Sequence, residues 1–316
     1  MGKEGRFERS AIAPGKIILT GEHFVVKGGL ALAGTVDRYI RVRARPADVF
    51  SVRYGFPGMK PMTKLARDHI YASIKDLLDG KGASLYVESN IPIGAGLGSS
   101  ASSSVAAVLA ISGLLNKPLT RQEVFEHAMK GERLVHSNPS GIDVMVSIMG
   151  GFMLYRKGEE PRPLNTAPLR ALVVDTGQRH RTGDMVNGVQ TFAIKNRELF
   201  DGMVSMANSI SSSAAQALIE GDLARLGSLL AFNQELLKAI GVSTDKIEQA
   251  IRSFRGVSYG GKLTGGGGGG FVINILKGDV IGVNTRRWAG SFIANLGVGG
   301  AKIEERAHIC DGGLPG

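Results

Sequence analysis

PIGAGLGSSASSS, residues 92–104, is the stretch that decides the fold. Three glycines, Gly94, Gly96 and Gly98, stand directly before small residues that predict a helix from Ser99 to Leu115. Glycine lets backbone N–H groups converge, and a helix N-terminus adds partial positive charge. The stretch therefore predicts a loop that binds phosphate. On the glycine spacing alone, a tight turn followed by serine caps is an equal alternative.

Two commoner phosphate motifs fit this chain less well. Gly96, Gly98 and Ala101 match the dinucleotide fingerprint GxGxxA, but Pro92 separates them from the preceding strand. No acidic residue stands at the position expected to bind ribose. Residues 256–263 nearly match a Walker A loop, but this segment ends in leucine where the magnesium ligand, Ser or Thr, is required. We interpret both matches as accidental.

Acidic and basic residues suited to phosphoryl transfer occur in two further segments. Such chemistry needs a phosphate cradle, a metal ion, a cation and usually an Asp near the attacking hydroxyl. The candidates are Lys16 in APGK, Glu22 and His23 in GEH, and Glu132 and Asp143 in GERLVHSNPSGID. Taken singly, each is more often a surface lysine, a loop histidine or a helix cap. Only their combination indicates a site.

A second glycine run, LTGGGGGG, spans Gly265–Gly270 near the C-terminus. A flexible linker is one interpretation of such a run. The apolar segment that follows directly, residues 271–276, predicts a buried strand. Glycines joined to a buried strand favour a loop over a ligand.

Hydrophobic periodicity predicts a mixture of helices and strands. Helices are expected at residues 64–79, 99–115, 120–135, in several pieces between 183 and 254, and around 280–296; strands are expected at 10–19, 30–45, 84–89, 152–156, 171–175, 271–276 and near 302. Strict strand–helix alternation is missing, so the fold class is α+β. The proline-containing stretch 157–168 predicts a boundary between domains at 1–160 and 161–316.

Composition limits the classes of function. Hydrophobic residues make up 43% of 316, enough for extensive cores. Cys310 is the single cysteine, which excludes an intrachain disulfide and a cysteine-based metal site and fits a cytoplasmic protein. The charged N-terminus predicts no secretory signal, and the longest apolar stretch, Val105–Leu115, is too short to span a bilayer.

The net charge of +10 favours anionic partners or a solvated basic surface. Arg41, Arg43 and Arg45 share one strand face, which we expect to be solvated.

APGKIILTGEH, PIGAGLGSSAS and KLTGGGGGG, in this order, resemble the three motifs of the GHMP kinase superfamily. The resemblance spans nearly the whole chain. Within the superfamily, Phe24 and Val25 after GEH, the NPSGID run and KLTG look most like the mevalonate kinases. The resemblance implies an N-terminal domain similar to the second half of ribosomal protein S5 and a ferredoxin-like C-terminal domain. It also implies ATP and Mg²⁺ as cofactors.

The resemblance also implies a role for each candidate residue. Asp143 would accept or orient the proton of the substrate hydroxyl, and Lys16 would stabilise charge near the transferring phosphate. Ser100 and Glu132 would hold Mg²⁺. The nucleotide would lie along Gly94, Ala95, Gly96, Leu97, Gly98, Ser99, Ser100 and Ala101. The acceptor would lie along Glu22, His23, Thr182, Gly265 and Gly266.

The expected function is ATP-dependent phosphorylation of the C5 hydroxyl of mevalonate by a cytoplasmic homodimer, without nucleic-acid or membrane partners. One alternative is a kinase of the same superfamily for another alcohol, such as phosphomevalonate or a sugar. The other is a non-enzymatic RNA-binding protein, motivated by the basic charge and the ribosomal-protein-like domain. Aromatic residues at 6%, without a stacking motif, argue against RNA binding.

Overall fold

The computed structural model describes residues 8–55, 63–92, 96–136, 139–179, 182–278 and 283–304. Its helices and strands, in chain order, are β1 (Arg9–Thr20), the 3₁₀ helix η1 (Phe24–Lys27), β2 (Ala31–Pro46), β3 (Ser51–Tyr54), α1 (Lys64–Leu78), β4 (Ala83–Ser89), α2 (Ser99–Leu114), α3 (Arg121–Val135), α4 (Ile142–Met149), β5 (Phe152–Tyr155), β6 (Arg162–Leu164), β7 (Leu169–Asp175), α5 (Thr182–Lys195), α6 (Arg197–Glu220), α7 (Leu223–Ala239), α8 (Asp245–Ser253), β8 (Ser258–Thr264), β9 (Phe271–Leu276), β10 (Phe292–Leu296) and β11 (Lys302–Ile303). The mixture of helices and strands confirms the α+β class.

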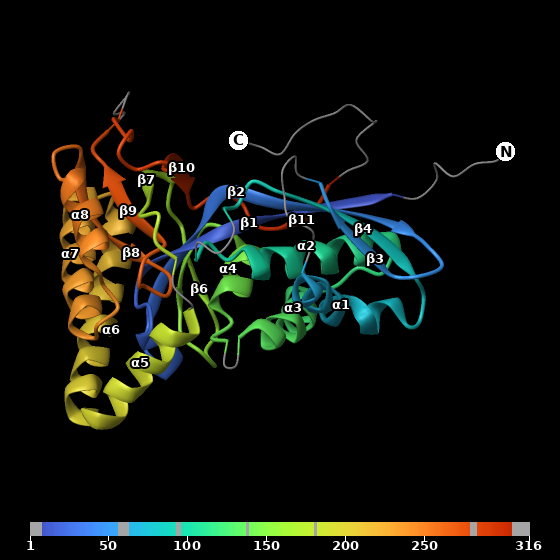
Figure 1. Cartoon of the computed structure of the whole chain (residues 1–316), viewed down its shortest axis with the longest axis horizontal. Coiled ribbons are helices and arrows are strands. Elements are labelled where there is room, and N and C mark those ends of the chain that lie inside the picture. Colours follow the sequence, from blue (N-terminus) through green and yellow to red (C-terminus); the bar gives the residue numbers. More distant parts are fainter. Residues whose placement is uncertain are drawn as a thin grey trace.

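One sheet joins all the described strands, in the order β11-β1-β2-β10-β7-β9-β8; β4 and β5 also pair with β2, β3 pairs with β4, and β6 pairs with β5. The long strand β2 is the hub, because successive parts of it pair with β5, β10 and β4. Figure 1 shows β1 and β2 running from the end covered by α1, α2 and α3 towards the end where α6, α7 and α8 stack. The two strands therefore connect the two groups of helices.

Helix α2 lies at the centre of the first group. The helix itself carries small and apolar residues on all sides, and most of its side chains are buried. A helix that is apolar all round belongs in a core, and α2 packs between β1 and β2 on one side and α1 and α3 on the other. Helix α3 begins at the predicted capping box, in which Thr120 and Glu123 each bond the other's backbone N–H.

The carbonyl of Pro14 on β1 holds two helices of this group. The β1–β2 register is irregular between Pro14 and Gly15. The carbonyl oxygen of Pro14 accepts hydrogen bonds from Ser102 of α2 at 2.7 Å and from Ser147 of α4 at 2.9 Å. Both hydroxyls are buried. Ser102 lies in the first turn of α2 and Ser147 in the last turn of α4, so both helices are fixed close to β1, two residues before Lys16.

The C-terminal part differs from the expectation at two places. The helix expected around residues 280–296 is wrong: residues 292–296 form strand β10, which pairs with β7 along its whole length. Two glycines, Gly282 and Gly290, interrupt this stretch and disfavour a helix. Strand β8 was not expected, because Gly260 and Gly261 mask its alternation. The near-match to a Walker A loop lies largely on this strand, so it opens no helix.

The sheet and the main core continue across the predicted boundary near residue 160. The largest apolar cluster includes Ile70 and Val105 from the first half and Leu226 and Ile273 from the second. Strand β11 also returns to pair with β1. The division into domains at 1–160 and 161–316 stays a prediction.

The arginine stripe on β2 is paired with acidic residues. Arg41 bonds Glu304, Arg43 bonds Glu88, and Arg45 bonds Glu8. Each positive charge of the stripe therefore faces a carboxylate, which weakens it as a surface for RNA phosphates. Within the described ranges, no helix is both long and apolar enough to cross a membrane.

Candidate active site

The phosphate loop enters α2 through two glycines with left-handed backbone. Gly96 and Gly98 both have φ of 74°. Gly98 is the N-cap and offers no side chain to cap the helix, so the first-turn N–H groups are left for another acceptor. A Cβ on Gly98 would lie 2.7 Å from Cγ of Lys16. The absence of a side chain at Gly98 therefore leaves room for the Lys16 side chain beneath the N-terminus of α2. A helix N-terminus attracts anions, so this position suits a phosphate.

The remaining residues of the predicted phosphate loop have different surroundings. Leu97 and Ala101 are buried in the core, so they can meet a nucleotide only through their backbone. Ser99 and Ser100 are partly buried in the first turn of α2. Gly94 and Ala95 lie outside the described residues.

Lys16 and Asp143 form an ion pair beside this loop. The lysine Nζ lies 3.1 Å from the aspartate Oδ1, and their side chains are 5% and 30% exposed. The backbone N–H of Lys16 donates to the carbonyl of Leu97 at 2.9 Å. Asp143 stands in the first turn of α4, after the N-cap Gly141. An almost buried cation and a partly exposed carboxylate therefore meet beside this loop.

Glu132 of α3 faces Ser100 at the start of α2. Its carboxylate is 3% exposed. Burial raises the pKa of Glu132, but hydrogen bonds from His69 and Ser100 outweigh burial and leave the pKa below its usual value. The carboxylate is therefore ionised at neutral pH. A carboxylate and a hydroxyl are hard oxygen ligands that suit Mg²⁺ bound mainly through substrate phosphates. Among the described residues, no group of three or more His, Cys, Asp and Glu could hold a metal ion by itself.

His23 occupies a turn directly after β1. Its φ is 62°, and Nε2 lies 3.1 Å from the carbonyl oxygen of Gly266. Burial lowers the pKa of His23 to about 4, although the bond to Gly266 opposes this shift. The imidazole is therefore neutral at pH 7. Because a carbonyl only accepts, Nε2 carries the hydrogen, and Nδ1 is left as the acceptor.

Glu22 lies behind His23, away from solvent. Its side chain is 1% exposed and forms an ion pair with Lys262 of β8, which is 0% exposed. The other carboxylate oxygen accepts from Nδ2 of Asn233 at 3.3 Å, and Asn233 in turn accepts from the N–H of Gly21 at 3.1 Å. Burial raises the pKa of Glu22 and lowers that of Lys262, while their contact opposes both shifts. Glu22 thus joins GEH to KLTG.

The second glycine run is an ordered loop against the first. The N–H of Gly268 donates to the carbonyl of Val242 at 2.8 Å, and that of Gly270 donates to Gln178 at 2.9 Å. A Cβ on Gly265, whose φ is 86°, would lie 3.2 Å from the Cα of Gly96. These bonds argue against a flexible linker and bring the two glycine loops into contact.

Sequence reasoning missed three buried residues of this region: Lys262, Asn233 and His69. Lys262 belongs to the quoted KLTG motif, so its place directly before the second glycine run was an available signal. Asn233 and His69 lie on amphipathic helices without a motif around them. Thr182 is the first residue of α5, and its side chain is outside the described part of the structure.

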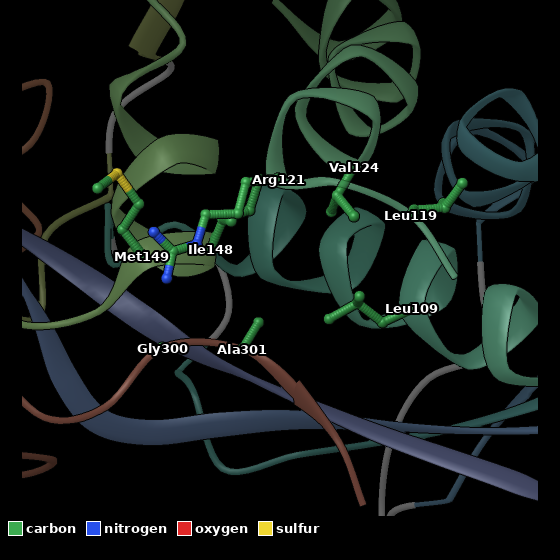
Figure 2. Close-up of a pocket in the computed structure, with 8 residues that line it drawn as sticks. All are labelled: Leu109, Leu119, Arg121, Val124, Ile148, Met149, Gly300 and Ala301. Atoms are coloured by element: carbon green, nitrogen blue, oxygen red, sulfur yellow. The ribbon is translucent and has the colours of Figure 1, made fainter. Parts of the chain in front are cut away.

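A cavity of about 290 Å³ lies elsewhere in the first helix group. Figure 2 shows Arg121 directed towards Ile148 and Met149 there, with Leu109 on the facing helix. These residues belong to the start of α3 and to the C-terminal parts of α4 and α2, whereas the site stands at the N-termini of α2 and α4. None of the candidate site residues lines this cavity.

Two family models and several curated proteins match this chain. Residues 64–151 match the family model described as GHMP kinases N terminal domain, and residues 214–280 match GHMP kinases C terminal. A mevalonate kinase of Aeropyrum pernix is 36% identical, covering 93% of this chain and 98% of that protein. One of Archaeoglobus fulgidus is 34% identical, covering 93% and 99%.

A solved structure shares the fold over almost the whole chain. The crystal structure of L. major mevalonate kinase in complex with R-mevalonate superposes with a TM-score of 0.79 at 28% identity. The match covers 95% of this chain and all of that one.

Loss of the buried lysine should destabilise the protein more than loss of the whole pair. Lys262→Met leaves the Glu22 carboxylate buried without its counter-charge, and we expect a loss of about 3–5 kcal/mol in the free energy of unfolding. Adding Glu22→Gln in the same chain should recover most of the lost free energy of unfolding. Urea unfolding measures this free energy for the single and the double variant. Lys130→Met, which breaks an exposed pair with Asp76, is the control and should cost under about 1 kcal/mol. Equal losses in the single and double variants would contradict the coupling.

The neutral His23 should make stability fall in mild acid. Between pH 6.5 and about 4 the unfolded chain binds a proton at His23 that the folded chain does not. Stability is therefore full above pH 6.5 and decreases as the pH falls through this window, by up to about 1.4 kcal/mol per pH unit. His23→Gln should remove this component, because glutamine does not titrate. Urea midpoints of both proteins from pH 7 to 4 measure the difference; parallel curves would refute it.

Proposed function

We propose, because this chain belongs to the GHMP kinase family, that it is a mevalonate kinase, which transfers the γ-phosphoryl group of ATP to the C5 hydroxyl of mevalonate. The observation that carries the chemistry is the meeting of Lys16 and Asp143, 3.1 Å apart, beside the N-terminus of α2. The choice of acceptor rests on relatives 36% and 34% identical over nearly their full lengths. The products are 5-phosphomevalonate and ADP.

The donor side of the site is built for a triphosphate. GHMP kinases of the mevalonate kinase type use ATP. We place its phosphates along the backbone from Gly94 to Ala101, where the uncapped first turn of α2 offers N–H donors. Ser100 and Glu132 would hold Mg²⁺, and their hydroxyl and carboxylate oxygens fit that ion. When bound, the ion would neutralise the negative charge of the phosphates.

On the acceptor side, Asp143 orients the attacking hydroxyl and accepts its proton. Its side chain is open enough to reach a substrate, unlike that of Glu22. Lys16 keeps its charge close to the transferring phosphoryl group, where preorganised positive charge favours the transition state. His23, Gly265 and Gly266, together with Thr182, line the acceptor pocket. Glu22 acts on this pocket from behind, through Lys262 and the turn that carries His23.

We also propose a cytoplasmic homodimer. The single cysteine fits a reducing compartment. Large apolar side chains exposed on the second helix group, including Ile194, Leu199 and Phe232, offer surface for a second copy.

The acceptor is tested by measuring ATP consumption with Mg²⁺ against mevalonate, phosphomevalonate, galactose and homoserine in parallel. We expect a turnover on the order of 1–100 per second with mevalonate and background rates with the others. Turnover with a different alcohol would move the substrate and keep the chemistry. Salt-sensitive RNA binding without ATP consumption would replace the enzyme by a binding protein.

Asp143→Asn should lower turnover by about 10²–10⁴-fold, because the amide cannot accept the hydroxyl proton. The substitution is nearly isosteric, so KM for ATP should change little. Steady-state kinetics with mevalonate measure both. Asp76→Asn, on the exposed face of α1, is the matched control and should keep full turnover. Near-normal turnover of Asp143→Asn would remove the role assigned to this residue.

A further inference from the structure

His69 of α1 is a buried histidine that contacts the candidate metal ligand from inside the protein. Its side chain is 4% exposed. Nε2 lies 3.2 Å from Oε1 of Glu132 on α3 and 2.9 Å from Oγ of Ser104 on α2. No role for His69 follows from the sequence motifs, which begin at residue 13 and resume at residue 92. The imidazole therefore lies where three helices meet, beneath the phosphate loop.

The surroundings of His69 hold the ring in place. The hydroxyl of Ser73 lies 3.1 Å from the carbonyl oxygen of His69 and 2.8 Å from Oγ of Ser104. Gly131, directly before Glu132, packs against the same turn of α1: a Cβ there would clash with Ser73 Oγ and lie 2.7 Å from the His69 carbonyl oxygen. The close approach of α1 and α3 thus brings Glu132 to the histidine.

These contacts restrict the Glu132 carboxylate on two sides. Oε1 accepts from His69, and the hydroxyl of Ser100 bonds the same carboxylate from the phosphate loop. The exposed ring of His136 is farther away, with Nε2 3.8 Å from Oε2. A buried carboxylate needs such a donor, because an unpaired oxygen would be costly. An imidazole can donate this hydrogen bond without the permanent positive charge of lysine or arginine, and such a charge would compete with a metal ion for the carboxylate.

We propose that His69 is a positioning residue that orients Glu132 for a divalent cation bound with the nucleotide. This role rests on the proposed function, since it assumes that Glu132 is a metal ligand. Groups that hold a metal ligand in place are typically worth about 10–100-fold in metal affinity. The effect of His69 should therefore appear in the part of ATP binding that depends on Mg²⁺, and not in ATP binding as such.

The experiment compares ATP binding by calorimetry in Mg²⁺ and in EDTA, without acceptor. The measured quantity is the factor by which Mg²⁺ strengthens binding. We expect His69→Phe to reduce this factor about 10-fold or more, with binding in EDTA and KM for mevalonate unchanged within about 2-fold. His69→Gln, which keeps an N–H donor, should retain most of the factor. His127→Phe, at a partly buried histidine of α3 that lies near Lys130 and Asp76, is the matched control and should behave as wild type.

A double-mutant cycle separates positioning from a general structural role. Glu132→Gln should lose at least as much of the Mg²⁺ factor as His69→Phe, and the combined variant should lose no more than Glu132→Gln alone. An unchanged factor in His69→Phe would overturn the inference, as would equal losses in Mg²⁺ and EDTA. If His69→Phe does not fold, His69→Asn tests the same contact, because its shorter side chain withdraws from Glu132.

The outcomes also separate this inference from the proposed function. An intact Mg²⁺ factor in wild type without turnover on mevalonate would count against the acceptor alone. A wild-type protein whose ATP binding ignores Mg²⁺ would overturn the metal assignment and the role of His69 together.

Discussion

The carbonyl of Pro14 is the contact on which the rest of the site depends. Hydroxyls from two helices, Ser102 of α2 and Ser147 of α4, donate to this one oxygen. Because β1 continues from Pro14 to Lys16, the same short segment fixes the cation, the first turn of α2 and the last turn of α4 relative to one another. Asp143, in the first turn of the same short helix α4, meets Lys16 there. The site is therefore preorganised by its scaffold, as transition-state stabilisation requires.

Two ion pairs in this site differ mainly in their exposure. Lys16 and Asp143 pair at an opening, so their charges remain available to a substrate. Glu22 and Lys262 pair in complete burial, so their charges largely cancel and act on the structure. A buried pair contributes little net stability but makes the loss of either partner costly. It thereby fixes GEH against KLTG, and with them the bond from His23 to Gly266.

Local periodicity predicted much of the fold, and motif order predicted the candidate site residues that lie within the motifs. Glycines directly before a helix start favour a phosphate-binding loop through local backbone geometry, so this loop could be proposed from its own residues alone. Strand β8 was missed and β10 was taken for a helix, because glycine and scattered apolar residues leave the period ambiguous. The partnerships of Lys262, Asn233 and His69 join residues 63 to 240 positions apart. Such contacts arise from packing, which no local pattern encodes.

The pairing of β11 with β1 has a consequence for how the protein is made. His23 leaves the ribosome 243 residues before Gly266, whose carbonyl oxygen its ring contacts. The strand that pairs with the outer side of β1 is made later still. Until then the nascent chain carries an incomplete sheet edge and one member of each long-range pair. The candidate site therefore forms only after Gly266 and β11 have been synthesised, and a chain that stops before Gly266 should lack it.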